Sequence, residues 1–188
     1  MSKVSDIVIC AADYLALDEL ANAMKSGGTL SGERLTERDD LLRCVNIAAA
    51  DVALSVRAPS NYKICSSVGG GIFYSNVDER LLEVYDVRTT NGKKVAYTVY
   101  SDRVLIEDGT YYVYYTFVPV NLTLSSELPF PESTFGRAIT YAVCSEYCVA
   151  TGADGEANKW HVLFLREAEK LKIKRLASGG RLAARRWF

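Results

Sequence analysis

The spacing of apolar residues changes twice along this chain, and these changes constrain the fold more than any other feature. Before Pro59 apolar residues recur at helical spacing, whereas residues 62–117 are rich in β-branched side chains and hold nine of the twelve tyrosines. After Pro129 the helical spacing returns. The sequence therefore predicts an α+β fold, in which an antiparallel helical bundle of two N-terminal and two C-terminal helices carries an inserted antiparallel β-meander.

The first two helices are predicted from their apolar spacing and their end signals. Ser5 or Asp6 is expected to cap a helix that runs to about Lys25, where a Ser-Gly-Gly run ends it. A second helix is expected after the polar connection 29–40, with apolar residues at helical spacing from Leu41 to Val56.

The last two helices are predicted to form an αα-hairpin. The first begins near Ser133 and carries Phe135 and Ile139 on one face, and Gly152 follows its end. Asp154 is expected to cap the second helix, which continues towards Leu176. A loop of about four residues between helices is typical of antiparallel neighbours.

The tyrosine-rich segment is expected to contain two consecutive hairpins. Asn91-Gly92 and Asp108-Gly109 each separate two alternating stretches, and such dipeptides favour tight hairpin turns. These two loops are predicted to face the tail of a larger assembly or neighbouring subunits. Tyr97, Tyr112 and Tyr114 are predicted to form a sheet interface, because alternating tyrosines favour half-buried pairs and contact surfaces.

The chain is therefore divided into a helical body (1–60 and 127–178), an inserted β-rich subdomain (61–126) and a C-terminal arm (179–188). Its formal net charge of −1 is unevenly distributed. Residues 171–188 hold six basic residues and no acidic one, which leaves 16 basic against 23 acidic residues in the rest. A basic end on an acidic body suits docking onto a neighbour, possibly a second copy.

No pattern in the sequence indicates a catalytic, metal or cofactor site, and we expect none of the three. The single histidine, His161, is more typical of helix packing or the surface than of catalysis. Cys144 and Cys148 lack a second ligand pair, and all five cysteines are expected to be reduced and buried. The glycine-rich stretch 67–73 is expected to bend the chain between strands, since it lacks the lysine and helix of a phosphate loop. Six acidic residues among the strands disfavour a nucleic-acid-binding sheet.

The C-terminal end indicates an extended docking arm. Gly179 and Gly180 are predicted to form a hinge before the arm, whose contact residues are Arg181, Arg185, Arg186, Trp187 and Phe188. Arginine can bind carboxylates through two hydrogen bonds, and Trp and Arg are frequent in binding hot spots. The alternative is a frayed, solvated end of the last helix.

Three stretches carry a resemblance to a known class of proteins. These are DDLLRCVNIAAADVALSV, the β-rich insertion from about Tyr62 to Val118, and LPFPESTFGRAITYAVCSEYCVATGADGEANKWHVLFLREAEKLK with the arm behind it. The arrangement resembles the head-to-tail connectors of tailed bacteriophages, in particular the adaptor or tail tubular protein A family of short-tailed phages.

The resemblance implies a virion protein without enzymatic activity. It implies a homo-oligomeric ring, commonly a dodecamer, that lies between the portal protein and the tail nozzle or tube and extends the channel through which genomic DNA passes without specific contacts. It also implies that the arm Arg181 to Phe188 reaches the portal.

Several alternatives stay open at the level of sequence. Within the same neck, the chain could be a head-closure (stopper) or tail-terminator protein. A nucleic-acid-binding or regulatory module that uses the basic end is an alternative of another class, and a small enzyme of unrecognised type is a third. The start of the chain lacks the pattern of a signal peptide, and no run reaches the length of a membrane span, so no membrane partner is expected.

Overall fold

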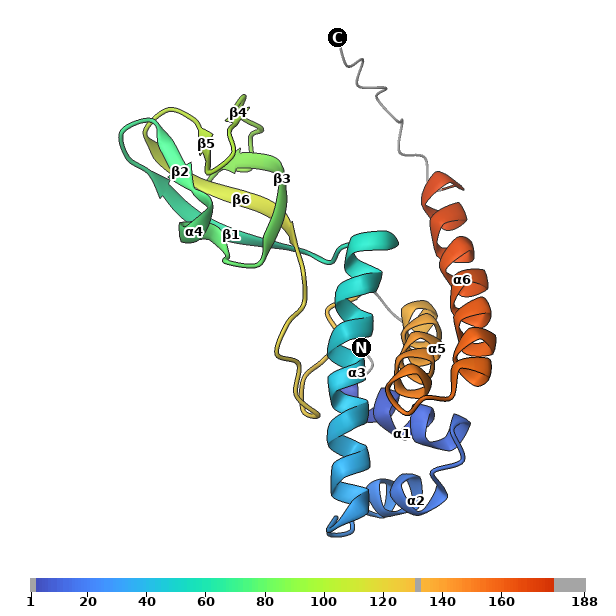
Figure 1. The fold of residues 1–188 in the computed structure, drawn as a ribbon. Coiled ribbons are helices and arrows are strands. Elements are labelled where there is room, and N and C mark those ends of the chain that lie inside the picture. Colours follow the sequence, from blue (N-terminus) through green and yellow to red (C-terminus); the bar gives the residue numbers. More distant parts are fainter. Residues whose placement is uncertain (1–2, 131–132, 178–188) are drawn as a thin grey trace. The chain divides into compact units, whose positions relative to one another are not determined.

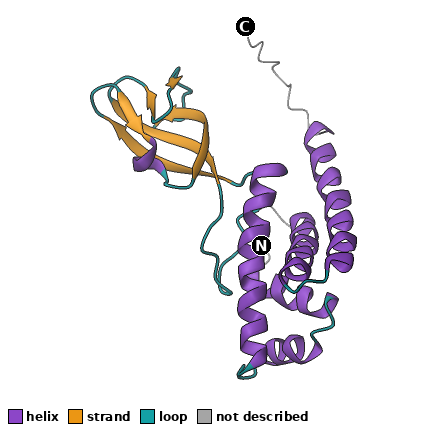
Figure 2. Cartoon of the chain, viewed as in Figure 1, coloured by secondary structure: helices purple, strands orange, loops and turns teal. Residues whose placement is uncertain are grey.

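The computed structural model describes residues 3–130 and 133–177. Within them it confirms the predicted mixed α+β class, and it contains six helices and two antiparallel three-stranded sheets where four helices and one meander were predicted. The chain divides into a helical unit, which runs up to Asp51 and resumes at Leu122, and a β-rich unit, Val52–Asn121 (Figures 1 and 2).

The helical unit surrounds a core of aliphatic side chains. Leu20, Leu41, Val45, Ile139 and Val143 are fully buried. The elements that supply this core are α1 (Val4–Tyr14), α2 (Asp18–Ser26), α3 (Glu33–Ser55, whose last turn is counted with the β-rich unit), α5 (Ser133–Ala150) and α6 (Asp154–Ala177).

The prediction of one N-terminal helix up to Lys25 is wrong, because the chain breaks between α1 and α2. Ala16 adopts a left-handed backbone with φ 57°. Leu17 N donates to Ala12 O and Ala16 N donates to Asp13 O, the bonding pattern of a Schellman end. Glycine usually occupies the left-handed position of this motif, so an alanine there gave no stop signal in the sequence.

The second helix also differs from its prediction. It begins at Glu33, directly after Gly32, rather than near Leu41. The charged residues 33–40 were interpreted as a connection because they lack an apolar period. In the structure they form the first turns of a 23-residue helix, and both Leu35 N and Thr36 N donate to Gly32 O at its start.

The predicted C-terminal αα-hairpin is confirmed, with α5 and α6 side by side and antiparallel (Figure 1). Gly152 has φ 76° and Ala153 N donates to Cys148 O at 2.8 Å, so α5 ends in a Schellman motif. Asp154 is the first helical residue of α6 rather than its cap. Phe135 and Ile139 are buried as expected.

Four of the five cysteines are buried and Cys10 is exposed, so the prediction fails only for Cys10. Burial raises the pKa of Cys44 to about 11 and that of Cys144 to about 12. These thiols therefore remain protonated at neutral pH and behave as small apolar side chains.

The β-rich unit is not a meander. One sheet has the strand order β1-β6-β3 and the other β2-β5-β4, so that β6, the last strand along the chain, lies in the centre of its sheet. The elements are β1 (Ser60–Ser67), β2 (Gly71–Phe73), α4 (Tyr74–Val77), β3 (Leu81–Thr89), β4 (Thr98–Val99), β5 (Arg103–Leu105) and β6 (Gly109–Phe117).

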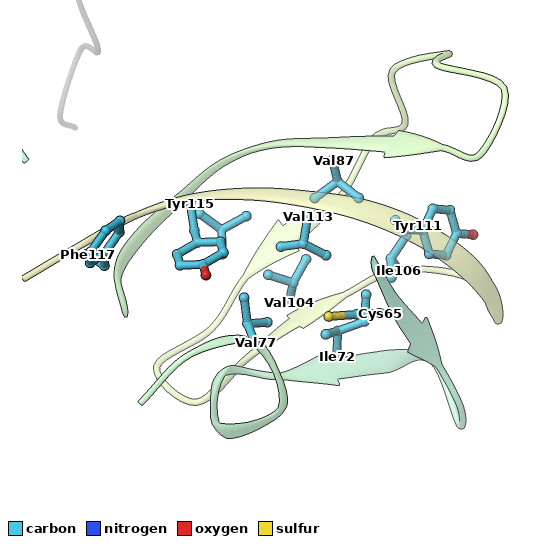
Figure 3. Packing of buried hydrophobic residues seen from close by; sticks show 11 residues of the cluster. Cys65, Ile72, Val77, Val87, Val104, Ile106, Tyr111, Val113, Tyr115 and Phe117 are labelled. Atoms are coloured by element: carbon cyan, nitrogen blue, oxygen red, sulfur yellow. The ribbon is translucent and has the colours of Figure 1, made fainter. Parts of the chain in front are cut away.

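Both sheets bury side chains in one common core (Figure 3). Val87 and Val113 reach it from the first sheet, and Ile72 and Val104 reach it from the second. All four side chains are at most 1% exposed. Val77 of the single-turn helix α4 also belongs to this core.

Of the two predicted hairpin turns, only the one at Asn91-Gly92 reverses the chain locally. Gly92 N donates to Thr89 O at 2.9 Å, and Gly92 alone of the pair has a positive φ, 79°. Asp108-Gly109 is not a hairpin turn, because β5 pairs with β2 and β4 whereas β6 pairs with β1 and β3. The glycine-rich stretch does bend the chain between β1 and β2, with positive φ at Gly69 and Gly70.

Candidate interaction surface

The central strand β6 has two chemically different faces. Tyr111, Val113 and Tyr115 point into the core and are buried. Because side chains alternate along a strand, Tyr112 and Tyr114 point to the opposite side of the sheet. β6 therefore directs tyrosines to both faces, and only one face is covered within the unit.

The outer side of this sheet forms what we call the tyrosine face, made of Tyr62, Ile64, Tyr85, Tyr112 and Tyr114. The antiparallel register places Tyr62 opposite Tyr114 and Ile64 opposite Tyr112. Tyr62 is 56%, Ile64 55% and Tyr85 47% exposed. Large apolar surfaces that gather on one face are typical of interaction sites.

The rings of the tyrosine face contact one another. Tyr62 lies 5.8 Å from Tyr112 and 5.7 Å from Tyr114 between ring centroids, and Tyr85 lies 6.3 Å from Tyr114. Such spacing is within the range of favourable aromatic pairs. Side chains that already contact one another lose less conformational freedom when a partner binds.

Irregularities in β3 shape one side of this face. The register with β6 shifts between Leu81 and Glu83 and again between Val84 and Asp86, so that Tyr85 is the extra residue of the second bulge. This bulge lets Val84 and Val87 both stay buried while Tyr85 points outward.

An ion-pair group lies beside the rings. Arg88 Nε donates to Asp86 Oδ2 at 2.8 Å, and Lys94 Nζ lies 3.7 Å from the same oxygen. The Arg88 guanidinium lies over the Tyr114 ring, 5.3 Å from its centroid, a cation–π geometry. The hydrogen bond to Asp86 raises the pKa of Arg88 above its usual range. The face thus already holds one arginine on an aromatic ring.

The structure places only some of the predicted contact residues on this surface. Tyr112 and Tyr114 lie on the tyrosine face, whereas Tyr97 lies outside the strands and packs against the β core. The predicted arm and hinge residues, Gly179, Gly180, Arg181, Arg185, Arg186, Trp187 and Phe188, lie outside the described residues.

The two predicted loops lie at the same end of the sheet. Gly109 lies opposite Ser67 on β1, and Thr89, which precedes Asn91-Gly92, lies opposite Tyr111 of β6. Asp108 has a structural contact to the loop after β1, since its Oδ1 accepts a hydrogen bond from Gly70 N at 2.7 Å.

Sequence reasoning missed Tyr62, Ile64 and Tyr85 as members of the face. The alternation of Tyr62 and Ile64 before Cys65 was a usable signal for two faces of one strand. Which strand lies beside it depends on long-range pairing, which the sequence pattern did not reveal.

Another polar group in the β-rich unit has a structural role. The Asp78 carboxylate accepts hydrogen bonds from Arg80 and from the Tyr115 hydroxyl, and these bonds lower the pKa of Asp78. Asp78 and Arg80 line an open hollow of about 590 Å³ together with Lys63. Both carboxylate oxygens of Asp78 already accept hydrogen bonds, so the Asp78–Arg80–Tyr115 group stabilises the chain around Tyr115.

Residues 3–130 and 133–177, the described ranges, contain no group of three or more His, Cys, Asp or Glu residues placed to hold a metal ion. Within the same ranges, no helix combines the length and apolar character needed to cross a bilayer. His161 is exposed on α6, and its ring lies 5.9 Å from that of Phe164.

Comparison of the sequence with models of known protein families and with curated proteins found no match.

Proposed function

We propose that this chain is a structural protein of a phage virion, a head-to-tail adaptor that forms a ring between portal and tail and extends the DNA channel. The proposal combines the sequence resemblance with one structural observation that carries it, the exposed tyrosine face. A protein that works by assembly needs large apolar contact surfaces, and this face supplies one.

In this proposal the two units have different tasks. The helical unit forms the body of the ring, and the β-rich unit contacts the tail protein or a neighbouring subunit through the tyrosine face. The arm Arg181 to Phe188 docks on the portal. The ring is expected to consist of about twelve copies. Ordering the arm costs conformational entropy, and contacts with the partner offset this cost, so the ring is expected to form or gain stability when its partners bind.

Co-sedimentation with the portal protein encoded in the same genome tests the proposal. The full chain is expected to sediment with the portal, and a chain that lacks Arg181 to Phe188 is expected to remain folded and stay in the supernatant. A chain carrying Tyr62→Ser and Tyr114→Ser is the matched control, because it should retain portal binding and lose its contacts to the tail or to subunits. Portal binding by the truncated chain would refute the arm assignment.

Electron microscopy of the same mixtures separates the alternatives. Rings bound to portals support an adaptor, whereas particles bound only to tail tubes support a tail terminator. DNA binding that weakens steeply with salt and is lost with the arm would instead support the nucleic-acid-binding alternative.

A further inference from the structure

Strand β1 is an edge of its sheet. The hydrogen bonds that β6 makes show which backbone groups of β1 face away from the sheet. Phe117 N, at the end of β6, donates to Pro59 O at 3.1 Å, while Val118 N, one residue beyond the strand, donates to Arg80 O on the β3 side at 3.0 Å. In an antiparallel pair the bonding direction alternates from residue to residue. The backbone groups of Tyr62, Ile64 and Ser66 therefore point away from β6.

This edge is open. Tyr62 N donates to its neighbour Asn61 Oδ1 at 2.9 Å, a bond within the strand itself. Across the described part of the chain, no second strand takes up the outward backbone groups of Ile64 and Ser66. Six of the eight residues of β1 are exposed, and its pairing with β6 runs without a register shift.

The opposite edge of the same sheet is protected. β3 carries two bulges, which bend an edge away from a flat pairing geometry. The chain that follows the Asn91-Gly92 turn also covers the end of β3, since Val95 N donates to Val87 O at 3.0 Å. A long, regular edge with apolar side chains is a template for strand addition, and of the two edges of this sheet β1 is the one that retains these properties.

We propose that two copies of the free chain associate through β1, which pairs antiparallel with the β1 of the second copy around a two-fold axis at Ile64. This inference concerns the chain before any assembly and does not rest on the proposed function. The two copies would form one continuous six-stranded sheet in the order β3-β6-β1-β1-β6-β3 and join their tyrosine faces.

Two observations favour a second copy as the occupant. A two-fold axis brings each outward N–H opposite an outward C=O of the same set of residues, so the edge is complementary to itself. The β-rich unit is also neutral, with seven basic and seven acidic residues between 52 and 121, so two copies meet without net repulsion.

The charge of Lys63 selects the register. Centred on Ile64, the pairing places Lys63 beside Cys65 of the second copy and Tyr62 beside its Ser66. Centred on Lys63, it would place two ammonium groups opposite each other, which is destabilising. Ile64 thus lies opposite its own counterpart at a Cα separation of roughly 5.5 Å.

Light scattering coupled to gel filtration tests the association with the full chain at micromolar concentration. The wild type is expected to have twice the mass of the 20.8 kDa chain. Ile64→Pro removes an N–H that β6 does not use and should give a folded monomer, whereas Ile64→Val should remain a dimer. Ile64→Lys, which retains the N–H and places two charges opposite each other, should also be monomeric and serves if the proline variant does not fold.

Cysteine cross-linking tests the register in a Cys10→Ser background, because Cys10 is exposed. Ile64→Cys should form a covalent dimer on mild oxidation, since its Cα separation suits a disulfide. Ser66→Cys is the matched control on the same face, where the two sulfurs would be separated by about four residues, or roughly 13 Å, and should not cross-link.

Several results would overturn the proposal. A monomeric wild type, or an oligomer that Ile64→Pro and Ile64→Lys leave intact, excludes this edge. Loss of the dimer when residues 178–188 are deleted would identify the C-terminal segment as the occupant instead. Cross-linking at position 66 and not at 64 would exclude the register.

Discussion

The two units of this chain distribute their large apolar side chains differently between core and surface. In the helical unit, the helices share one core of fully buried aliphatic side chains, and the large apolar side chains that stay exposed in its described residues are Tyr14, Leu35, Ile47, Val149, Val162 and Leu165. In the β-rich unit, the sheet β1-β6-β3 buries one face against the second sheet and presents five large apolar side chains on the other. The difference supports the proposal that the β-rich unit makes the contacts of an assembly.

Charge follows the same division. Outside residues 171–188, the helical unit holds nine basic and sixteen acidic residues, whereas the β-rich unit is neutral. Like copies of the helical unit therefore repel each other more strongly at low salt. Self-association is expected to depend on the β-rich unit.

The largest effect is expected when a buried and an exposed isoleucine of the β-rich unit are each replaced and the losses of stability are compared. Ile72 is 1% exposed in the core, whereas Ile64 is 55% exposed on the tyrosine face. Ile72→Ala should lower the free energy of unfolding by about 2–5 kcal/mol through the cavity it leaves. Ile64→Ala should change it by less than about 0.5 kcal/mol. Urea unfolding at low protein concentration measures both, and equal losses would contradict the division into an inner and an outer face.

In the helical unit, one side chain joins α3 to the segment that leads to α5. Asn46 Nδ2 donates to Leu42 O and Leu122 O, and Asn46 Oδ1 accepts from Leu122 N at 2.7 Å. Asn46→Ala should lower the free energy of unfolding by about 1–3 kcal/mol, because the backbone of Leu122 loses its partners. Asn22→Ala, at an exposed helical position, is the control and should be nearly neutral.

The Asp78 group should make the stability of the β-rich unit depend on pH. Its folded pKa is lowered by the Arg80 and Tyr115 hydrogen bonds, so its contribution is present above the unfolded pKa of about 3.9. The contribution is lost as the pH falls through the folded pKa. Asp78→Asn should therefore be less stable than the wild type by about 1–3 kcal/mol at neutral pH, and the difference should shrink towards pH 2.

The control for this pH experiment is Asp102→Asn, which changes an exposed carboxylate paired only with the adjacent Arg103. Its stability should differ little from that of the wild type. A pH-independent difference for Asp78→Asn would show that the carboxylate charge does not contribute.

The smallest effect concerns the turn at Asn91-Gly92 in the β-rich unit. Gly92 has φ 79° and open space around its Cα, so Gly92→Ala should cost about 1 kcal/mol from backbone strain alone. Asn91→Ala should cost less, because only Gly92 of this pair has a positive φ. Thermal unfolding of the two variants distinguishes this turn from a type I′ hairpin turn, in which both central residues have a positive φ.

The same contrast explains what could be predicted from the sequence. The α5–α6 hairpin depends on neighbours along the chain, namely Gly152 and the apolar spacing on both sides, and it was predicted correctly. The strand order was not, because β6 pairs with β1 across some fifty residues and no local pattern encodes that choice. The break at Ala16 was missed for a different reason, since its left-handed backbone occurs at an alanine.

The candidate surface shows the same limit. Tyr112 and Tyr114 were predicted from alternation on a single strand, which is local information. Tyr97 was grouped with them because it lies in the same tyrosine-rich segment, but its side chain packs against the core from outside the strands. Tyr62 and Tyr85 join the surface only through the register of β1 and β3 with β6.

Amide hydrogen exchange of β1, followed by NMR at several protein concentrations, tests the central claim most directly. Lys63 lies opposite Val113 in the β1–β6 ladder, and the alternation directs its N–H towards β6, whereas the Ile64 N–H points to the open edge. Lys63 should be protected at every concentration, and Ile64 should become protected only as the concentration rises and copies associate. An Ile64 amide that exchanges rapidly at all concentrations would contradict the account, as would one already protected in the isolated monomer.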